Sequence, residues 1–282
     1  MKRAIRRIAT GFLLAVLACA LLAPAIAPYS YSRQFREAPD AAAGPRFPMG
    51  TDDLGRDRFS RLLYATRVSV VLAPAAALVS ILVALLISAL CGTRLGWLDH
   101  GVSGLTTLSL SLPWIFLFII LRAMLPLNTR PEASLLLTFG LMGVAGWAWP
   151  ARIFRASIRQ IRHSGWLTAA RAAGLSPARI ALVHVWPHLR AIAIAQFRVL
   201  IPAYILSEAS LGLLGLGVAE PLPSWGNLLA ELQHPGRVQD NPWVLAPLVL
   251  LMLVMIALEA LQPVNAQAEG AVARKWQSEV LN

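Results

Sequence analysis

Apolar and polar positions are distributed along this chain in long blocks. Six stretches are almost wholly apolar, and each is long enough to cross a lipid bilayer as a helix. Their approximate bounds are 8–28, 68–90, 105–125, 133–151, 191–217 and 244–262. The pattern predicts an all-α integral membrane protein with about six transmembrane helices.

The polar blocks between these stretches are short. None of the three largest has room for a separate soluble catalytic domain; they are 29–67, 152–190 and 218–243. We therefore predict three parts: a first transmembrane helix with a periplasmic segment (1–66), a transmembrane core (67–265) and a cytoplasmic C-terminal tail (266–282).

The first apolar stretch follows a cluster of basic residues, as the apolar part of a secretory signal peptide does. However, the run from Ile8 to Ala27 is longer than the apolar part of a typical signal. Pro28 also follows the short stretch Ala25-Ile-Ala27 directly, which should hinder cleavage there. We expect this stretch to remain as the first span.

Composition and charge agree with a membrane protein. Hydrophobic residues make up 57% of the chain and charged residues only 14%, against about a quarter charged in soluble domains. The net charge of +11 would suggest nucleic-acid binding in a soluble protein, but its placement here fits a membrane orientation and predicts no nucleic-acid partner.

The distribution of Lys and Arg predicts which side each loop faces. With the N-terminus inside, the inner segments hold 14 Lys and Arg and three acids, whereas the outer segments hold nine Arg and nine acids. Because cytoplasmic loops carry the excess of positive charge, both termini are expected in the cytoplasm. The acids of 29–67 are interleaved with its arginines, so the local field of that segment should be small.

The inner block 152–190 begins with four arginines, Arg152, Arg155, Arg159 and Arg162. Their spacings of three and four residues place them on one face of a helix. The simplest interpretation is a cationic helix end on anionic headgroups, so membrane lipid is an expected partner.

Two short helices are predicted in the rest of this block. The run from Trp166 to Ala173 is rich in good helix formers, and Gly174 suits the position just past a helix end. The next helix should start at Ser176 as its N-cap, with a proline at its first position, and continue from 178 to about 185.

This second helix is expected to end before Pro187. The two helices would meet at an angle around a tight glycine turn, and their alanines would leave a flat surface. From the pattern alone, the segment could dock another protein or rest as an amphipathic hairpin on lipid.

The sequence Thr168-Ala-Ala170, followed at fixed spacings by Gly174, His184 and Pro187, resembles the EAA loop of ABC importer permeases. The surrounding residues are similar to the dipeptide, oligopeptide and nickel branch of that family. In the family this loop forms the coupling helices, which fit a groove on the ATP-binding subunit. The resemblance implies a coupling role for Trp166, Thr168, Ala169, Ala170, Arg171, Gly174, Leu175, Ser176, His184 and Pro187.

The resemblance extends over residues 50–243. The blocks 50–69 and 206–227 look like the family's segments before the second span and around the fifth span. Three residues of the loop depart from the family pattern: Thr168 stands in place of Glu, Trp186 in place of Leu and His188 in place of Asn. The stretch 259–265 does not match the family's usual ending.

The resemblance implies several partners: a second permease subunit, which would complete the pore in a heterodimer; two ABC ATPase subunits; and a periplasmic solute-binding protein. Peptides or similar small solutes would be transported.

The chain has no GxxxxGK[ST] phosphate loop, and neither Lys2 nor Lys275 follows a glycine. Because that loop cradles nucleotide phosphates, we expect no cofactor and no enzymatic activity in this chain.

Glu208 is the deepest charge in the predicted spans, and a charge there costs roughly 2.5–3.5 kcal/mol. With its neighbours Ser207, Ser210, Gly215 and Gly217, it predicts a translocation path or gate. The alternatives are a structural glutamate bonded to a neighbouring helix, and glycines that serve close helix packing.

The outer block contains a rigid motif that carries an aromatic residue: Pro223, Ser224, Trp225, Gly226 and Asn227. It could form the periplasmic face that meets the binding protein, or anchor its tryptophan at the membrane interface.

His184 and His188 have the i, i+4 spacing of zinc ligands, but Pro187 lies between them and a third ligand is lacking nearby, so no metal site is expected.

Two other classes of function fit the sequence less well. A self-sufficient secondary transporter would need coupling charges at mid-membrane and an internal repeat, but only Glu208 lies deep and no repeat is evident. A membrane scaffold would not need a helix–glycine–helix docking surface. The sequence therefore favours a permease subunit of an ATP-driven importer.

Overall fold

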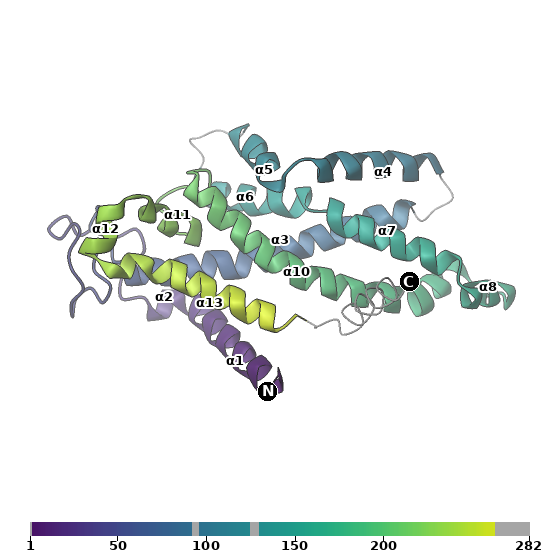
Figure 1. Ribbon diagram of the computed structural model, residues 1–282, viewed down its shortest axis with the longest axis horizontal. Helices are drawn as coiled ribbons and strands as arrows, with labels where there is room; N and C mark the ends of the chain where they lie inside the picture. Colours follow the sequence, from purple (N-terminus) through teal and green to yellow (C-terminus); the bar gives the residue numbers. More distant parts are fainter. Residues whose placement is uncertain (1, 92–95, 125–129, 263–282) are drawn as a thin grey trace, which may run out of the picture.

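The computed structural model describes residues 2–91, 96–124 and 130–262. The predicted tail, 266–282, lies outside these residues. Within them the chain forms an elongated helical bundle without a β-strand, and an irregular segment joins the second helix to the third (Figure 1).

The first half of the chain contains α1 (Lys2–Leu21), α2 (Ala23–Ile26), α3 (Arg58–Cys91), α4 (Gly96–Ser111), α5 (Trp114–Ala123), α6 (Pro131–Ala145) and α7 (Ala148–Arg162). The second half contains α8 (Gly165–Ala172), α9 (Pro177–Arg179), the π-helix η1 (Ile180–Val185), α10 (Trp186–Leu213), α11 (Trp225–Ala230), η2 (Glu231–Gln233), α12 (Pro235–Asp240), η3 (Pro242–Leu245) and α13 (Ala246–Ala260).

Five helical stretches of the described chain are long and apolar enough to cross a membrane. They are Arg3–Leu21, Arg58–Cys91, Pro131–Arg162, Pro177–Leu213 and Pro242–Ala260. They correspond to the first, second, fourth, fifth and sixth predicted spans. The predicted fold class, an all-α membrane protein, is confirmed.

The third predicted span, 105–125, is not a single helix. It is divided into α4 and α5, which lie at an angle to each other (Figure 1). Pro113 causes the break, because it has no backbone N–H and also disfavours the helical conformation of Leu112 before it. Neither helix alone reaches the length that a straight span needs.

The central helix, α3, packs against α1, α6, α7 and α10. Its fully buried apolar positions are small: Ala65, Ala73, Ala77 and Ala84. Several of its large side chains point outward instead, and Leu78, Leu82, Leu86 and Leu90 are more than half exposed. This arrangement suits a helix surrounded by lipid. Small residues there let helices pack closely, and large apolar side chains gain nothing from burial because lipid tails are equally apolar.

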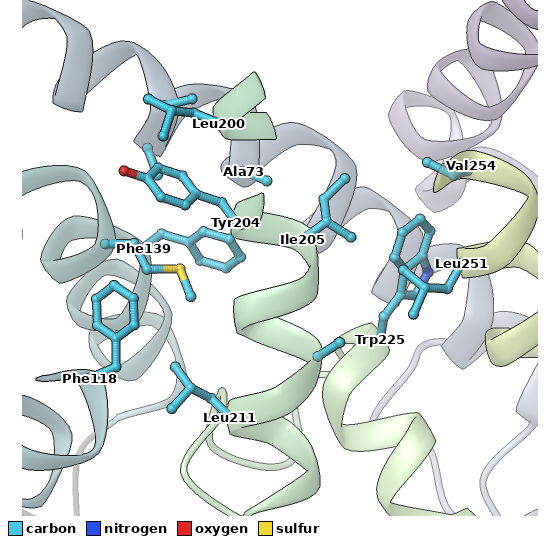
Figure 2. Packing of buried hydrophobic residues seen from close by; sticks show 14 of the residues in the cluster. Ala73, Phe118, Phe139, Leu200, Tyr204, Ile205, Leu211, Trp225, Leu251 and Val254 are labelled. Carbon is cyan, nitrogen blue, oxygen red and sulfur yellow. The ribbon is translucent and has the colours of Figure 1, made fainter. Parts of the chain in front are cut away.

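Larger side chains fill the core where α10 meets its neighbours. Figure 2 shows Tyr204 of α10 beside Phe139 of α6, and Trp225 of α11 beside Leu251 and Val254 of α13. The Tyr204 hydroxyl lies 2.5 Å from Ser80 Oγ of α3, so this part of the core also holds a buried hydrogen bond.

The predicted inner and outer loops lie at opposite ends of the bundle. Figure 1 shows α8 at one end of the long axis and α11 and α12 towards the other. The irregular segment before α3 lies at the same end as α12, where Asn241 Nδ2 donates a hydrogen bond to the carbonyl oxygen of Met49. The fold therefore separates two candidate functional regions along its length.

Candidate functional site

The first region is the coupling hairpin, defined as residues 165–185. Its first arm, α8, ends in a paired hydrogen-bond motif in which Leu175 N–H donates to Ala170 O at 3.2 Å and Gly174 N–H donates to Arg171 O at 3.0 Å. This motif requires a residue with positive φ, and Gly174 has φ of +77°. The predicted glycine turn is confirmed.

The second arm starts as predicted. The Ser176 side chain accepts a hydrogen bond from Arg179 N–H at 3.3 Å, and Pro177 occupies the first turn, where a missing N–H costs nothing. Ser176 therefore has a local structural role as the N-cap.

The second arm does not end before Pro187, and that prediction is wrong. The chain continues through η1 into α10, and Trp186 N–H bonds to Ala181 O five residues earlier. Pro187 is accommodated because it lies in the first turn of α10. The hairpin is thus joined directly to a membrane-spanning helix, without a loop between them.

Apolar contacts hold the two arms together. Leu167 and Ala170 of α8 and Ile180 of η1 are buried against one another, with Leu175 packed beside them. Ala170 therefore belongs to the interior of the hairpin. The exposed surface of the first arm and its turn includes Thr168, Ala169, Arg171, Ala172, Ala173 and Gly174.

An aromatic contact ties the first arm to the start of α10. The Trp166 ring stacks on His188, with centroids 5.5 Å apart and an interplanar angle of 13°. His184 lies 5.9 Å from the same indole ring, and His188 Nδ1 lies 2.9 Å from the His184 carbonyl oxygen. His188 was absent from the predicted coupling set, although its departure from the family pattern had marked it.

The four arginines at the start of the inner block do not share one environment. Arg152, Arg159 and Arg162 are exposed, but Arg155 is buried. Arg155 Nη2 lies 2.7 Å from Asp99 Oδ1 and also donates to Ser103 Oγ, which fastens α7 to α4. The prediction that all four face lipid is therefore wrong for Arg155.

Glu208 is fully enclosed within the protein. It accepts hydrogen bonds from Ser69 Oγ of α3 at 3.0 Å and from Gly226 N–H of α11 at 3.3 Å. These bonds supply partners for a carboxyl group that would otherwise be costly in the membrane. The arrangement favours the structural alternative for Glu208.

The glycines after Glu208 have two different roles. A Cβ on Gly217 would lie 2.8 Å from Gly212 Cα, so these positions serve close packing. Gly215 instead ends α10 with φ of +72°, in the same paired hydrogen-bond motif as Gly174. Ser207 is buried, whereas Ser210 is half-buried and Gly215 exposed, so a role along a translocation path stays a prediction for these residues.

The outer motif folds inward rather than outward. Pro223, Ser224, Trp225 and Gly226 are all buried, and Trp225 is 0% exposed. Trp225 Nε1 donates to Thr66 Oγ1 at 3.1 Å, and Asn227 Nδ2 donates to the carbonyl oxygen of Val218 at 2.7 Å. The Trp225 side chain is therefore neither an exposed docking residue nor an interfacial anchor in this chain, because partners on α3 draw it into the core.

The second region is the outer cap, defined as residues 49–61 together with 218–243. A partly buried ionic cluster joins its two parts: Glu220 accepts from Arg56 Nη1 at 2.7 Å and from Arg61 Nη2 at 2.9 Å. Arg56 also pairs with Asp52 at 2.7 Å. Burial would lower the pKa of Arg56, but the charges of Asp52 and Glu220 outweigh it and raise that pKa.

Further ion pairs link the same two parts of the outer cap. Arg58 pairs with Glu231, and Arg237 Nη2 lies 2.9 Å from Asp53 Oδ2. The expectation that the acids of 29–67 balance its own arginines is confirmed for two other pairs, Arg56 with Asp52 and Arg46 with Glu37. The partners in 218–243 of the arginines of 29–67 could not be read from the sequence, since they are more than 150 residues away.

The sequence of this chain is similar to those of known membrane proteins. Residues 84–268 match the family model of the binding-protein-dependent transport system inner membrane component. The chain belongs to this family. It is a permease subunit of a binding-protein-dependent ABC transport system, a non-catalytic multi-pass component of the inner membrane.

Several relatives resemble this permease over most of their length. It is 31% identical to the di/tripeptide transport system permease protein DppC of Pseudomonas aeruginosa over 88% of this chain and 81% of the relative. It is 32% identical to the oligopeptide transport system permease protein OppC of Escherichia coli K12 over 80% and 72%. It is 30% identical to the OppC protein of Mycobacterium bovis over 90% and 85%.

Membership of this family implies ATPase and binding-protein partners in general terms. In the permease, the coupling hairpin and the outer cap lie at opposite ends of the spans (Figure 1). A transport subunit with partners on both sides of a membrane needs such a separation. The two regions are therefore the candidate contact sites of this permease.

Proposed function

We propose that this permease forms half of the translocation pore of an ATP-driven importer for peptides or similar small solutes. A second permease subunit, in a heterodimer, would complete the pore. Two separate ABC ATPase subunits would dock at the coupling hairpins, and a periplasmic binding protein would deliver the solute at the outer cap. The peptide and oligopeptide transport named for the similar permeases supports this choice of solute.

The observation that carries the proposal is the continuity between the coupling hairpin and the fifth span. The exposed face of α8 offers small side chains, Ala169 and Ala172, which another protein can approach closely. The second arm then passes without interruption into α10. A push on the hairpin would therefore displace a transmembrane helix, which is how ATP-driven movement would switch the pore between two states.

The distribution of charge supports an orientation with the coupling hairpin in the cytoplasm. With the coupling hairpin in the cytoplasm, its exposed arginines lie on the side where Lys and Arg are enriched. The N-terminus would then also be cytoplasmic, as would the C-terminus after α13. The outer cap, in which acids neutralise most arginines, would face the periplasm.

A concave apolar face supports the second-subunit proposal. A groove of about 390 Å³ runs between α4, α5, the α6–α7 junction and α10. Trp149, Val199 and Leu206 on this face are exposed, and Ser207 also contributes to its lining. We assign this face to the partner permease, with the pore between them.

A competing secondary-transport mechanism has less support. It would need a deep titratable group open to solute, but Glu208 is enclosed by hydrogen bonds from Ser69 and Gly226. Glu208 then serves as a link between helices.

The test is co-purification of the permease with its ATPase subunits. Ala169→Arg places a bulky charge on the exposed face of α8 and should abolish ATPase association and transport, while membrane insertion persists. Ala4→Arg, at an exposed position of α1 outside the hairpin, is the matched control and should retain both. Unchanged association in Ala169→Arg would remove the docking role of the hairpin.

A further inference from the structure

A second groove lies between the coupling hairpin and the ends of α3 and α7, and Arg171 of α8 lies at its edge. Its volume is about 850 Å³, and it is bounded by the ends of α3 and α7, by the hairpin and by the start of α10. Most of its lining is apolar, including Ile158, Leu182 and Leu189. Such a volume is far larger than a packing defect and can hold part of an extended apolar molecule.

Among the described residues that line this groove, the charged ones are both arginines. Arg162 comes from the last turn of α7 and Arg171 from the last turn of α8. Among the described residues, neither guanidinium has an ion pair or a hydrogen bond, and both residues are exposed. Two guanidinium groups from different helices therefore line the same groove, and arginine is the side chain that binds phosphate with bidentate geometry.

The groove lies where the membrane ends. Its lining includes Ala89, close to the end of the apolar span α3, and Trp186, at the start of α10. Trp186 and Leu182 are exposed beside the groove, at 47% and 69%. An aromatic residue and exposed apolar side chains at the end of spans are typical of the interface between lipid tails and headgroups.

We propose that this groove binds one anionic phospholipid, with Arg162 and Arg171 holding its phosphate and the apolar walls holding part of an acyl chain. Basic pockets between transmembrane helices on the cytoplasmic side are suited to such headgroups. The lipid bridges α7 to the coupling hairpin and supports the hairpin. This inference rests on the cytoplasmic orientation given under the proposed function.

The experiment measures lipid retained by the intact importer. The complex of permeases and ATPase subunits is reconstituted in nanodiscs of phosphatidylcholine with 20% phosphatidylglycerol, extracted and weighed by native mass spectrometry. The wild type should retain phosphatidylglycerol. Arg162→Gln combined with Arg171→Gln should bind it about 30-fold more weakly, because each arginine near an anionic headgroup contributes a factor of about five.

Two further variants separate this site from general surface charge. Arg152→Gln combined with Arg190→Gln removes the same charge from exposed positions outside the groove and should keep the lipid. Ala89→Phe narrows the apolar part of the groove without changing any charge, so this variant should lose the lipid. Inorganic phosphate added to lipid-free complex should not protect the hairpin from proteolysis, whereas phosphatidylglycerol should.

Equal retention in the wild type and the groove double variant would overturn the proposal, as would equal loss in the groove and control double variants. Protection by phosphate alone would show a simple anion site instead. ATPase co-purification is recorded on the same samples. A complex that assembles but retains no anionic lipid contradicts only the lipid site, whereas failure to assemble in the wild type contradicts the proposed coupling.

Discussion

Gly212 of α10 and Gly226 of α11 lie in direct backbone contact, so that a Cβ on Gly212 would be 2.3 Å from Gly226 Cα. This contact brings the outer end of the fifth span against the short helix of the outer cap. It leaves no room for a side chain on either residue.

Gly212→Ala should therefore destabilise the permease by about 1–3 kcal/mol, the usual cost of overpacking a filled core. Gly140→Ala is the matched control, because a Cβ on Gly140 would meet nothing within 4 Å. Alanine in that helix should be neutral or stabilising by up to about 1 kcal/mol. Thermal unfolding in detergent measures both, and equal unfolding temperatures for the two variants would contradict the contact.

Glu208→Ala should also destabilise the fold, by about 1–3 kcal/mol, because Ser69 Oγ and Gly226 N–H would lose their acceptor in a buried site. Glu208→Gln should cost less, since its amide keeps an acceptor oxygen. Solute uptake, normalised to folded protein, should survive in Glu208→Gln. Loss of uptake in a well-folded Glu208→Gln protein would instead favour a role in the translocation path.

Glu220→Gln removes the negative charge shared by Arg56 and Arg61. Arg61 is only 2% exposed, so it cannot turn to water, and the expected loss is roughly 1–3 kcal/mol. The loss is smaller than for a fully buried pair because Glu220 itself is half-exposed. Glu37→Gln breaks an exposed pair with Arg46 and should cost under about 1 kcal/mol in the same unfolding assay.

The pair of Asp53 and Arg237 should make the outer cap sensitive to acid. Burial pushes the pKa of Asp53 upward, but the hydrogen bond and charge of Arg237 outweigh it and hold that pKa below its usual 3.8. A lowered carboxyl pKa gives stabilisation that is complete above the usual value and is lost as the pH falls through the folded value.

The unfolding temperatures of wild type and Asp53→Asn should therefore differ by a constant amount between about pH 5 and 7 and converge below about pH 4. Asp240→Asn, at an exposed position of α12, is the control for the loss of a surface carboxyl group. A difference between wild type and Asp53→Asn that is independent of pH would refute the prediction.

The stack of Trp166 on His188 should affect coupling more than stability. His188→Ala removes the ring that ties α8 to α10, so ATP should be hydrolysed with less solute moved per cycle. His188→Phe keeps an aromatic surface and should restore the ratio. The measurement is the number of ATP molecules hydrolysed per solute imported in proteoliposomes; a ratio unchanged in His188→Ala would exclude this role.

Hydropathy and local residue chemistry were enough to predict most of the helices. The glycine turn at Gly174 and the N-cap at Ser176 depend on neighbours within five residues, so the sequence contains all the information that they need. The break at Pro113 was missed because apolar residues continue on both sides of it. The continuation through Pro187 was missed because a proline is compatible with the first turn of a helix as well as with an end.

The errors at the candidate sites have a common physical cause. Trp225 is drawn inward by Thr66, and Arg155 by Asp99, in both cases through contacts between residues far apart in sequence. Composition shows that a tryptophan or an arginine is present, but it does not show which distant group will satisfy it. The ionic cluster of the outer cap was missed for the same reason.

The outward-facing leucines and inward-facing alanines of α3 reverse the usual guide to which positions tolerate change. Exchanging Leu82 or Leu86 for another bulky apolar residue alters only what touches the lipid tails, so natural variation should accumulate there. Adding one methyl group at Ala73 or Ala77 would push neighbouring helices apart. In a deep mutational scan, the positions of this helix that tolerate the fewest substitutions should thus be its buried alanines.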